Sequence, residues 1–213
     1  MEGFISAVIG YLLGSIAFSK IIVKQTTGLD LSVEGSKNTG AMNSFETTGK
    51  KWVGVLVFFL DALKGYAACI IVYNLFPETE NMMTLLSYAG VFAVIGHNFN
   101  LWLRMKGGRG LATSVGVLLF INPLGIPLWG ICWLISYYGV RKNVHVANAL
   151  ATVATPIMVL VTPNLMIEIT TLVAFDEAAR YFQLISILCI VIFMKHIEPI
   201  QQLLKEKKLF NEE

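Results

Sequence analysis

The stretch GHNFNLWLRMKGGRGLAT, which runs from Gly96 to Thr113, lies between two long apolar segments and decides how the chain is interpreted. It holds three basic side chains, Arg104, Lys106 and Arg109, among closely spaced glycines. Glycine has no Cβ, so backbone N–H groups can approach a phosphate closely. A helix that begins directly after the loop adds unpaired N–H groups and the positive end of its dipole. The stretch therefore predicts an anion-binding loop, with charge from Lys106 and Arg109.

Composition indicates an integral membrane protein. Apolar residues make up 55% of the 213 residues, charged residues make up 14%, and the mean hydropathy is +0.67. A soluble globular domain has fewer apolar and more charged residues. A net charge of +2 argues against a nucleic-acid partner, and Cys69, Cys132 and Cys189 lie within apolar segments without paired spacing. We expect one polytopic all-α membrane domain over residues 1–213.

Seven membrane spans are predicted from the apolar segments and the distribution of basic residues. Lys and Arg gather in four segments: four in residues 24–51, three in the glycine loop, two at Arg141-Lys142 and four from Lys195 onward. The positive-inside rule places these segments in the cytoplasm, with the N-terminus outside and the C-terminus cytoplasmic. An even number of crossings must then separate the glycine loop from Arg141. Two short helices between Gly110 and Gly139, each about 20 Å long, meet this requirement, whereas one long span does not. The other spans are expected at about 3–23, 52–75, 85–99, 147–162 and 182–194, followed by an amphipathic surface tail at 197–210.

Two charged residues interrupt the second apolar segment. Asp61 and Lys64 are three positions apart and therefore share one face of a helix. Ionised side chains within a span are unfavourable unless they are paired or face a polar cavity. We interpret them as a structural polar pair that holds this helix against the first loop, with catalysis as the alternative.

The first polar loop contains a second glycine-rich stretch, GSKNTGAMNSFETTGK at residues 35–50. Ser36, Asn38 and Asn43 supply hydroxyl and amide groups, although composition alone is explained more simply by a turn-rich connection between helices. The predicted topology supports a functional role for this stretch. It lies on the same cytoplasmic face as the glycine loop, His145 and His196, so several loops can contribute to one site.

Four groups of residues follow one another in a distinctive order. They are Gly14-Ser15-Ile16, then Gly35-Ser36-x-Asn38-Thr39-Gly40-Ala41-x-Asn43, then Asp61-x-x-Lys64-Gly65, and finally Gly96-His97-x-Phe99 with Lys106-Gly107-Gly108-x-Gly110-x-Ala112-Thr113. Their order and spacing, over nearly the whole chain, resemble the bacterial acyl-phosphate:glycerol-3-phosphate acyltransferases, the PlsY family. His196 matches a histidine after the last span of that family.

The resemblance implies an enzyme of phospholipid biosynthesis in the cell membrane. It would move a fatty acyl group from an acyl phosphate to the 1-hydroxyl of glycerol 3-phosphate, giving lysophosphatidic acid on the cytoplasmic side, without a metal, a cofactor or a Ser-His-Asp triad. An acyl phosphate is already activated, so the protein has to bring two anionic substrates together and stabilise the leaving phosphate. The implied partners are these substrates, membrane lipids and, as a candidate, an enzyme that produces the acyl phosphate.

The resemblance also assigns residues. His196 and Arg109 are the expected catalytic residues: His196 contacts glycerol phosphate or its hydroxyl, and Arg109 stands where the family usually has lysine. The acyl chain is expected between helices. The expected substrate-binding residues are Ser36, Lys37, Asn38, Gly40, Asn43, His97, Lys106, Gly107, Gly108 and Gly110.

Several positions depart from the family pattern. Glu46 stands at a phosphate-binding arginine, Asn100 at a proline, Pro199 at an asparagine and Gln202 at an arginine, and residues 146–152 lack the usual serines. The departures fall mostly on the glycerol-phosphate half of the site, where Lys37, at a glycine position, is a candidate to restore charge. Two alternatives therefore remain open: a non-catalytic relative that binds acyl phosphate or partners an acyltransferase, and a channel or transporter.

Overall fold

The computed structural model describes residues 1–140, 142–173 and 178–205, and all regular structure in these ranges is helical. The elements, in chain order, are α1 (Glu2–Gly14), α2 (Phe18–Thr27), α3 (Ala41–Thr48), α4 (Lys51–Leu75), α5 (Met82–Asn98), the 3₁₀ turn η1 (Leu101–Leu103), α6 (Leu111–Ile121), α7 (Gly125–Gly139), α8 (Val144–Leu160), α9 (Asn164–Thr170), α10 (Ala178–Met194) and α11 (Ile197–Lys205).

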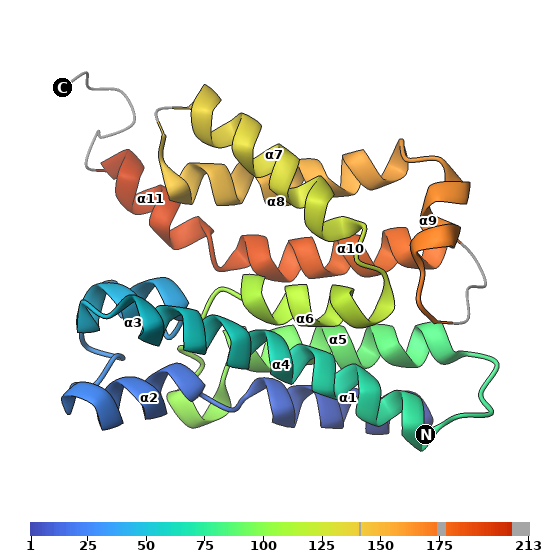
Figure 1. The fold of residues 1–213 in the computed structure, drawn as a ribbon, viewed down its shortest axis with the longest axis horizontal. Helices are drawn as coiled ribbons and strands as arrows, with labels where there is room; N and C mark the ends of the chain where they lie inside the picture. The colour runs from blue at the N-terminus through green and yellow to red at the C-terminus, as the bar shows by residue number, and fades with distance from the viewer. Residues whose placement is uncertain (141, 174–177, 206–213) are drawn as a thin grey trace.

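The long helices lie side by side and run in alternating directions along the long axis of the molecule (Figure 1). The pair α1 and α2 packs with α4 and α5 in the lower part of this view, and α7 and α8 pack together in the upper part. Helix α6 contacts α4 and α5, and α10 contacts both α8 and α5. The amino ends of α3 and α6 thus come to the same end of the bundle as α11.

Glycines set the closest helix contacts. A Cβ on Gly10 or Gly14 of α1 would lie 2.1 or 2.0 Å from a carbonyl oxygen of α5. Between α4 and α6, a Cβ on Gly116 would lie 1.7 Å from the Ala62 carbonyl oxygen, and one on Gly65 would lie 2.2 Å from that of Thr113. Small residues allow helix backbones to approach closely where lipid supplies no hydrophobic driving force. These contacts fix α6, and with it the glycine loop, against α4.

The predicted first span falls within the candidate span Glu2–Thr27, but a break at residues 15–17 divides it into α1 and α2. The break frees backbone carbonyls that a continuous helix would use. Asn100 donates to the Ser15 carbonyl at 2.6 Å, and the Lys64 ammonium donates to the Ile16 carbonyl at 3.1 Å. Both partners are distant in sequence, so local propensity could not reveal the break.

The remaining predicted segments match helices to within a few residues. The two short helices expected between Gly110 and Gly139 are confirmed as α6 and α7, with the break at residues 122–124. Helices α3 and α9 were not anticipated. Helix α11 covers the first part of the predicted tail, while residues 206–210 of that tail and Arg141 lie outside the described residues. Within the described residues, three helical segments are long and apolar enough to cross a membrane, or up to five if two bent pairs each count as one span.

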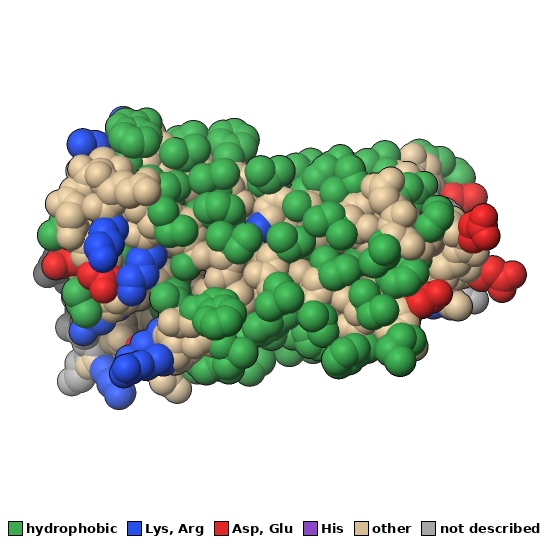
Figure 2. Space-filling view, turned by 90° about the horizontal axis from the view of Figure 1, so that it is seen from below, with side chains coloured by type: hydrophobic (Ala, Val, Ile, Leu, Met, Phe, Trp, Pro, Cys, Tyr) green, Lys and Arg blue, Asp and Glu red, His purple; other side chains and the backbone are tan. Residues whose placement is uncertain are grey.

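The surface is divided along the long axis. A broad apolar surface separates one end, where most Lys and Arg side chains gather, from the other end, which carries acidic side chains (Figure 2). The acidic end includes the exposed Glu78 and Glu80 of the α4–α5 connection. This is the charge distribution of a helical bundle that is surrounded by lipid over its middle.

Candidate active site

Two cavities meet near the basic end of the bundle, and Asn38 and Arg109 line both of them. The first, of about 480 Å³, is enclosed mainly by apolar side chains. The second, of about 560 Å³, is surrounded by charged and polar side chains. The junction is therefore a boundary between an apolar and a polar compartment, and a molecule with an apolar chain and an anionic head would match both.

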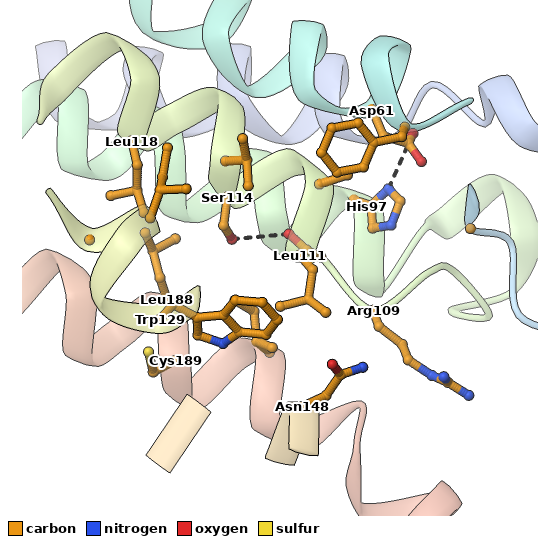
Figure 3. Close-up of a pocket in the computed structure, with 18 of the residues that line it drawn as sticks. Asp61, His97, Arg109, Leu111, Ser114, Leu118, Trp129, Asn148, Leu188 and Cys189 are labelled. Carbon is orange, nitrogen blue, oxygen red and sulfur yellow. Dashed lines mark hydrogen bonds and ion pairs between the residues drawn. The ribbon is translucent and has the colours of Figure 1, made fainter. Parts of the chain in front are cut away.

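The apolar cavity extends between α6, α7, α8 and α10. Leu118, Leu188 and Cys189 lie toward one end of it, whereas Asp61 and His97 lie toward the end at which Arg109 enters (Figure 3). Asn148, in the segment where the family usually has serines, also lines the cavity, and its amide oxygen accepts a hydrogen bond from the Trp133 indole at 2.7 Å. The apolar walls suit an aliphatic chain, and the polar groups are concentrated at one end.

The polar pocket carries a concentrated positive charge. Lys37, Lys106, Arg109 and Lys195 line it, together with the carboxylate-bearing Glu198. The other lining residues are Ser32, Gly35, Ser36, Asn38, Gly107, Gly108, His145, Pro199, Gln202 and Leu203. Four cationic side chains surround one carboxylate, so the pocket wall carries a net positive charge. This charge favours an anionic ligand.

The glycine loop is held by backbone contacts rather than left open. The Gly107 and Gly108 N–H groups donate to the carbonyls of Asn98 and His97, at 3.1 and 3.0 Å. A Cβ on Gly107 would lie 1.9 Å from the His97 carbonyl oxygen, so only glycine fits. These two amides therefore already have acceptors, and the expected contact of Gly107 and Gly108 with substrate stays a prediction.

Helix α6 begins at Leu111, two positions after Arg109, and supplies unpaired N–H groups that the two glycines do not. Gly110 is its N-cap, in the left-handed conformation with φ of 83°, and no side chain caps the helix. The first N–H groups of α6 consequently remain unpaired and add to the positive potential at the junction. Helix α3 begins similarly: its N-cap is Gly40, no side chain caps it, and Gly40, Ala41 and Met42 line the apolar cavity.

Asn43 organises the first loop. Its amide oxygen accepts from the Ser36 N–H at 3.0 Å, and its amide nitrogen donates to the carbonyls of Glu34 and Asn38, at 3.2 and 2.9 Å. Its side chain is fully buried and lines neither cavity. Asn43 thus positions Ser36 and Asn38, which do line the cavities. The side chain of Asn43 itself does not reach either cavity, so the structure does not show its predicted direct contact with substrate.

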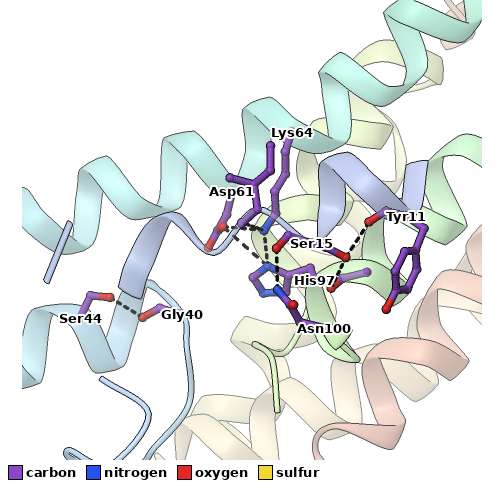
Figure 4. Close-up of polar contacts among 10 residues, drawn as sticks. Tyr11, Ser15, Gly40, Ser44, Asp61, Lys64, His97 and Asn100 are labelled. Carbon is purple, nitrogen blue, oxygen red and sulfur yellow. Dashed lines mark hydrogen bonds and ion pairs between the residues drawn. The ribbon is translucent and has the colours of Figure 1, made fainter. Parts of the chain in front are cut away.

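A buried polar cluster lies beside the junction. Lys64 forms an ion pair with Asp61 at 2.9 Å and lies 2.7 Å from Nδ1 of His97 (Figure 4). The third contact of the Lys64 ammonium is the Ile16 carbonyl. The pair therefore joins α4 to the α1–α2 break and to α5, and not to the first loop as the sequence suggested.

The Arg109 guanidinium lies at the centre of the site. Its NH1 is 3.2 Å from Nδ1 of His145, a residue of α8. Partial burial lowers the pKa of Arg109, and the carboxylates of Glu198 and Glu46 oppose this shift. An arginine stays protonated across the physiological range, so the side chain keeps its charge while partly shielded from water.

His196 is placed differently from the other predicted residues. Its side chain is fully buried, Nδ1 lies 2.9 Å from the Ile192 carbonyl oxygen, and Nε2 has no hydrogen-bond partner among the described residues. It lines neither cavity. Its predicted contact with the acceptor stays a prediction.

The structure brings most of the other predicted residues to the two cavities. Ser36, Lys37, Lys106, Gly107 and Gly108 line the polar pocket; Gly40, His97 and Gly110 line the apolar cavity; Asn38 and Arg109 line both. Glu46 is exposed on α3 and lines neither. Sequence reasoning missed three residues of the pocket wall, His145, Lys195 and Glu198. The sequence placed His145 on the cytoplasmic face without a specific role, and it placed Lys195 only among the basic residues of the tail.

Comparison with known proteins explains this arrangement. Residues 4–206 match the sequence profile of the family described as glycerol-3-phosphate acyltransferase. The chain belongs to this glycerol-3-phosphate acyltransferase family. The glycerol-3-phosphate acyltransferase of Wolbachia pipientis subsp. Culex pipiens is 34% identical over 98% of both chains. That of Halalkalibacterium halodurans is 33% identical over 97% of this chain and 95% of its own.

A solved acyltransferase structure shares the fold. The crystal structure of PlsY (YgiH), an integral membrane glycerol 3-phosphate acyltransferase in its glycerol 3-phosphate form, is 29% identical. It superposes with a TM-score of 0.74 over 97% of this chain and 94% of PlsY. A lysophosphatidic acid form of PlsY superposes with a TM-score of 0.73. The all-helical membrane architecture of this acyltransferase family member is therefore that of PlsY.

Proposed function

We propose that this protein transfers a fatty acyl group from an acyl phosphate to glycerol 3-phosphate and releases lysophosphatidic acid and phosphate. One observation carries the proposal: an apolar cavity and a cationic pocket share Asn38 and Arg109 as walls. An acyl phosphate has the same order of parts, an aliphatic chain, a carbonyl and a phosphate. With its chain in the apolar cavity and its phosphate on the cations, the carbonyl carbon lies at the junction.

The chemistry needs positioning and charge stabilisation more than it needs a protein nucleophile. The acceptor hydroxyl attacks the carbonyl carbon, a carbon–oxygen bond to the acceptor forms, the bond to the phosphate oxygen breaks, and the hydroxyl proton ends on the phosphate. Lys106, Arg109 and the unpaired N–H groups of α6 stabilise the negative charge that grows on the leaving phosphate.

The acceptor occupies the outer part of the polar pocket in this proposal. Lys37 and Lys195 provide charge for its phosphate, and Ser36 and His145 provide hydrogen-bonding groups. PlsY has been crystallised in glycerol 3-phosphate and lysophosphatidic acid forms, which supports the same acceptor and product for this chain. His196 would reach the acceptor only after a rearrangement of the side chains that cover it. An acyl-phosphate-producing enzyme must supply the donor.

The proposal includes a topology of seven passes, formed by α1 with α2, then α4, α5, α6, α7, α8 and α10. Their alternating directions support it, as do the basic end around the polar pocket and the acidic end near the N-terminus (Figures 1 and 2). The positive-inside rule then puts the polar pocket and the C-terminus in the cytoplasm and the N-terminus outside. Labelling of Lys24→Cys but not Glu80→Cys by a membrane-impermeant thiol reagent in inside-out vesicles tests this orientation, because all three native cysteines are buried.

The alternatives are not favoured. Arg109 is at the junction of the two cavities and Lys106 lines the polar pocket beside it, so the cations of the donor side are present. The relatives that match along the whole chain are named acyltransferases. A non-catalytic relative or a channel would not require a donor cavity and an acceptor pocket that meet at one point.

Phosphate release from palmitoyl phosphate by the purified protein in detergent, with and without glycerol 3-phosphate, tests the function. We expect release that depends on glycerol 3-phosphate, forms lysophosphatidic acid and is lost in Lys106→Ala/Arg109→Ala. Arg104→Ala is the matched control, because Arg104 belongs to the same loop but is exposed and lines neither cavity. Absence of release from a folded wild-type protein would overturn the assignment for this acceptor.

A further inference from the structure

The ammonium group of Lys64 has three close acceptors. They are Oδ1 of Asp61 at 2.9 Å, Nδ1 of His97 at 2.7 Å and the Ile16 carbonyl oxygen at 3.1 Å. An ammonium group has three N–H donors and no acceptor, so each hydrogen is used once. The Lys64 side chain is almost completely buried, so no water competes for these donors.

This geometry decides which nitrogen of His97 carries the proton. Lys64 can only donate, so Nδ1 of His97 must accept and has no hydrogen of its own. The Asp61 carboxylate lies 3.6 Å from Nδ1, which is beyond hydrogen-bonding distance. A hydrogen on Nδ1 could therefore not be donated to Asp61 instead. The neutral ring therefore carries its hydrogen on Nε2.

Nε2 lies against the glycine loop. A Cβ on Gly108 would come within 2.0 Å of it, and the Gly108 N–H bonds to the carbonyl of His97 itself, so ring and loop are fixed relative to each other. Within the part of the chain that the structure describes, Nε2 has no hydrogen-bond partner. His97 lines the polar end of the apolar cavity, near Arg109 (Figure 3), and is absent from the wall of the polar pocket.

We propose that Asp61 and Lys64 hold His97 as the Nε2–H tautomer and that this N–H donates a hydrogen bond to the carbonyl oxygen of the bound acyl phosphate. The inference rests on the proposed function and adds a residue role to it. The phosphate belongs to the polar pocket, which His97 does not reach, and the aliphatic chain offers no acceptor. The carbonyl oxygen is the remaining partner at this end of the cavity.

The donor acts on the transition state. When the acceptor hydroxyl attacks, negative charge accumulates on the carbonyl oxygen, and a fixed N–H in a water-poor site stabilises that charge. His97 keeps its hydrogen throughout, so no proton is transferred to or from the ring. His97 is then a catalytic residue, whereas Lys64 and Asp61 are positioning residues that act through it.

Two substitutions separate this role from a structural one. The amide of Gln reaches about as far as Nε2 and can donate there, while the shorter Asn places its amide near Nδ1 and can still accept from Lys64. We expect His97→Gln to keep kcat within about 10-fold and His97→Asn to lose roughly 100-fold in kcat, with the KM for acyl phosphate little changed in both. If His97 only anchors Lys64, Asn will be the better replacement, and that order overturns the inference.

A measurement that does not depend on turnover completes the test. In protein with ¹⁵N-labelled histidine, with the His97 signals assigned by their loss in His97→Gln, we expect an unprotonated Nδ1 and a protonated Nε2. Adding a long-chain β-ketophosphonate, in which a methylene replaces the bridging oxygen so that the carbonyl is kept but the acyl group cannot be transferred, should shift the Nε2 signal. An alkyl phosphonate without a carbonyl should not. A protonated Nδ1, or equal responses to the two ligands, overturns the inference. An inactive wild type overturns the proposed function instead.

Discussion

The proposed donor side and the proposed acceptor side of this site are built in different ways. On the donor side, the loop from Gly96 to Gly110 is fixed by backbone contacts, and a Cβ on Gly107 or Gly108 would overlap with His97. On the acceptor side, the wall consists of side chains from the first loop, α8 and α11, including Lys37, His145 and Glu198. Backbone contacts tolerate no replacement, whereas a side-chain wall can exchange one cation for another.

The departures from the family pattern occur on both sides, but the two sides accommodate them differently. Pro199 and Gln202 line the polar pocket, whereas Glu46 is exposed on α3 and lines neither cavity. The donor side departs at Asn100 and in residues 146–152 as well as at Arg109, and Arg109 preserves the charge of the usual lysine. The positive charge of the acceptor pocket is supplied here by Lys37 and Lys195, from other positions.

The largest effect is expected on the donor side, from Gly108→Ala. The new methyl group would lie 2.0 Å from Nε2 of His97, so the loop or the ring must move. A displacement of about 1 Å at a reacting centre can reduce turnover about 100-fold, and we expect at least that loss in phosphate release. The control is Gly139→Ala, because a Cβ on Gly139 meets nothing within 4 Å. Wild-type activity in Gly108→Ala would show that the loop is not fixed as described.

A smaller effect is expected from narrowing the apolar cavity with Val115→Trp. Val115 lines the cavity, and excluding two methylene groups of the acyl chain costs about 1.6 kcal/mol, or roughly 15-fold in kcat/KM. The loss should appear with palmitoyl phosphate and be much smaller with an octanoyl donor. Leu119→Trp, one turn further along α6 and lining neither cavity, is the control. Equal losses of kcat/KM with both donors would mean that the acyl chain binds outside this cavity.

On the acceptor side, we expect Lys37→Gly to raise the KM for glycerol 3-phosphate by about 5-fold, the equivalent of roughly 1 kcal/mol, and to leave the KM for acyl phosphate unchanged. Lys37 has a positive φ of 57°, so glycine relieves backbone strain while it removes the charge. The Lys37→Arg variant should keep the wild-type KM for glycerol 3-phosphate. A lower KM in the glycine variant would mean that Lys37 hinders the acceptor.

The smallest effect is expected from Glu46→Gln. Glu46 is exposed on α3 and lines neither cavity, so only a screened electrostatic influence on Arg109 is removed. The KM for glycerol 3-phosphate should fall by about 2-fold or less at low salt and remain unchanged at high salt. A decrease of 10-fold or more would place this carboxylate in the acceptor site after all.

The same contrast determines what could be predicted from sequence. The glycine loop, the apolar segments and the short helices α6 and α7 are local features, so spacing and hydropathy were sufficient to find them. The α1–α2 break was not predictable, because its carbonyls are satisfied by Lys64 and Asn100, which are 48 and 85 positions away. His145 and Lys195 reach the pocket only through the packing of α8 and α10 on the rest of the bundle. No periodicity in their own segments indicates this.

The three acceptors of the Lys64 ammonium also limit how this chain can evolve. A neutral replacement of Asp61 leaves a buried cation without its counter-ion, and a replacement of Lys64 leaves a buried carboxylate, a histidine and a backbone carbonyl without their donor. Each single step leaves an unpaired buried charge, whereas a concerted neutral change of both residues leaves none and requires only a new donor for His97 and the Ile16 carbonyl. Descendants of this sequence can therefore remodel the acceptor wall by single substitutions, while the cluster beneath the donor site can change only as a unit.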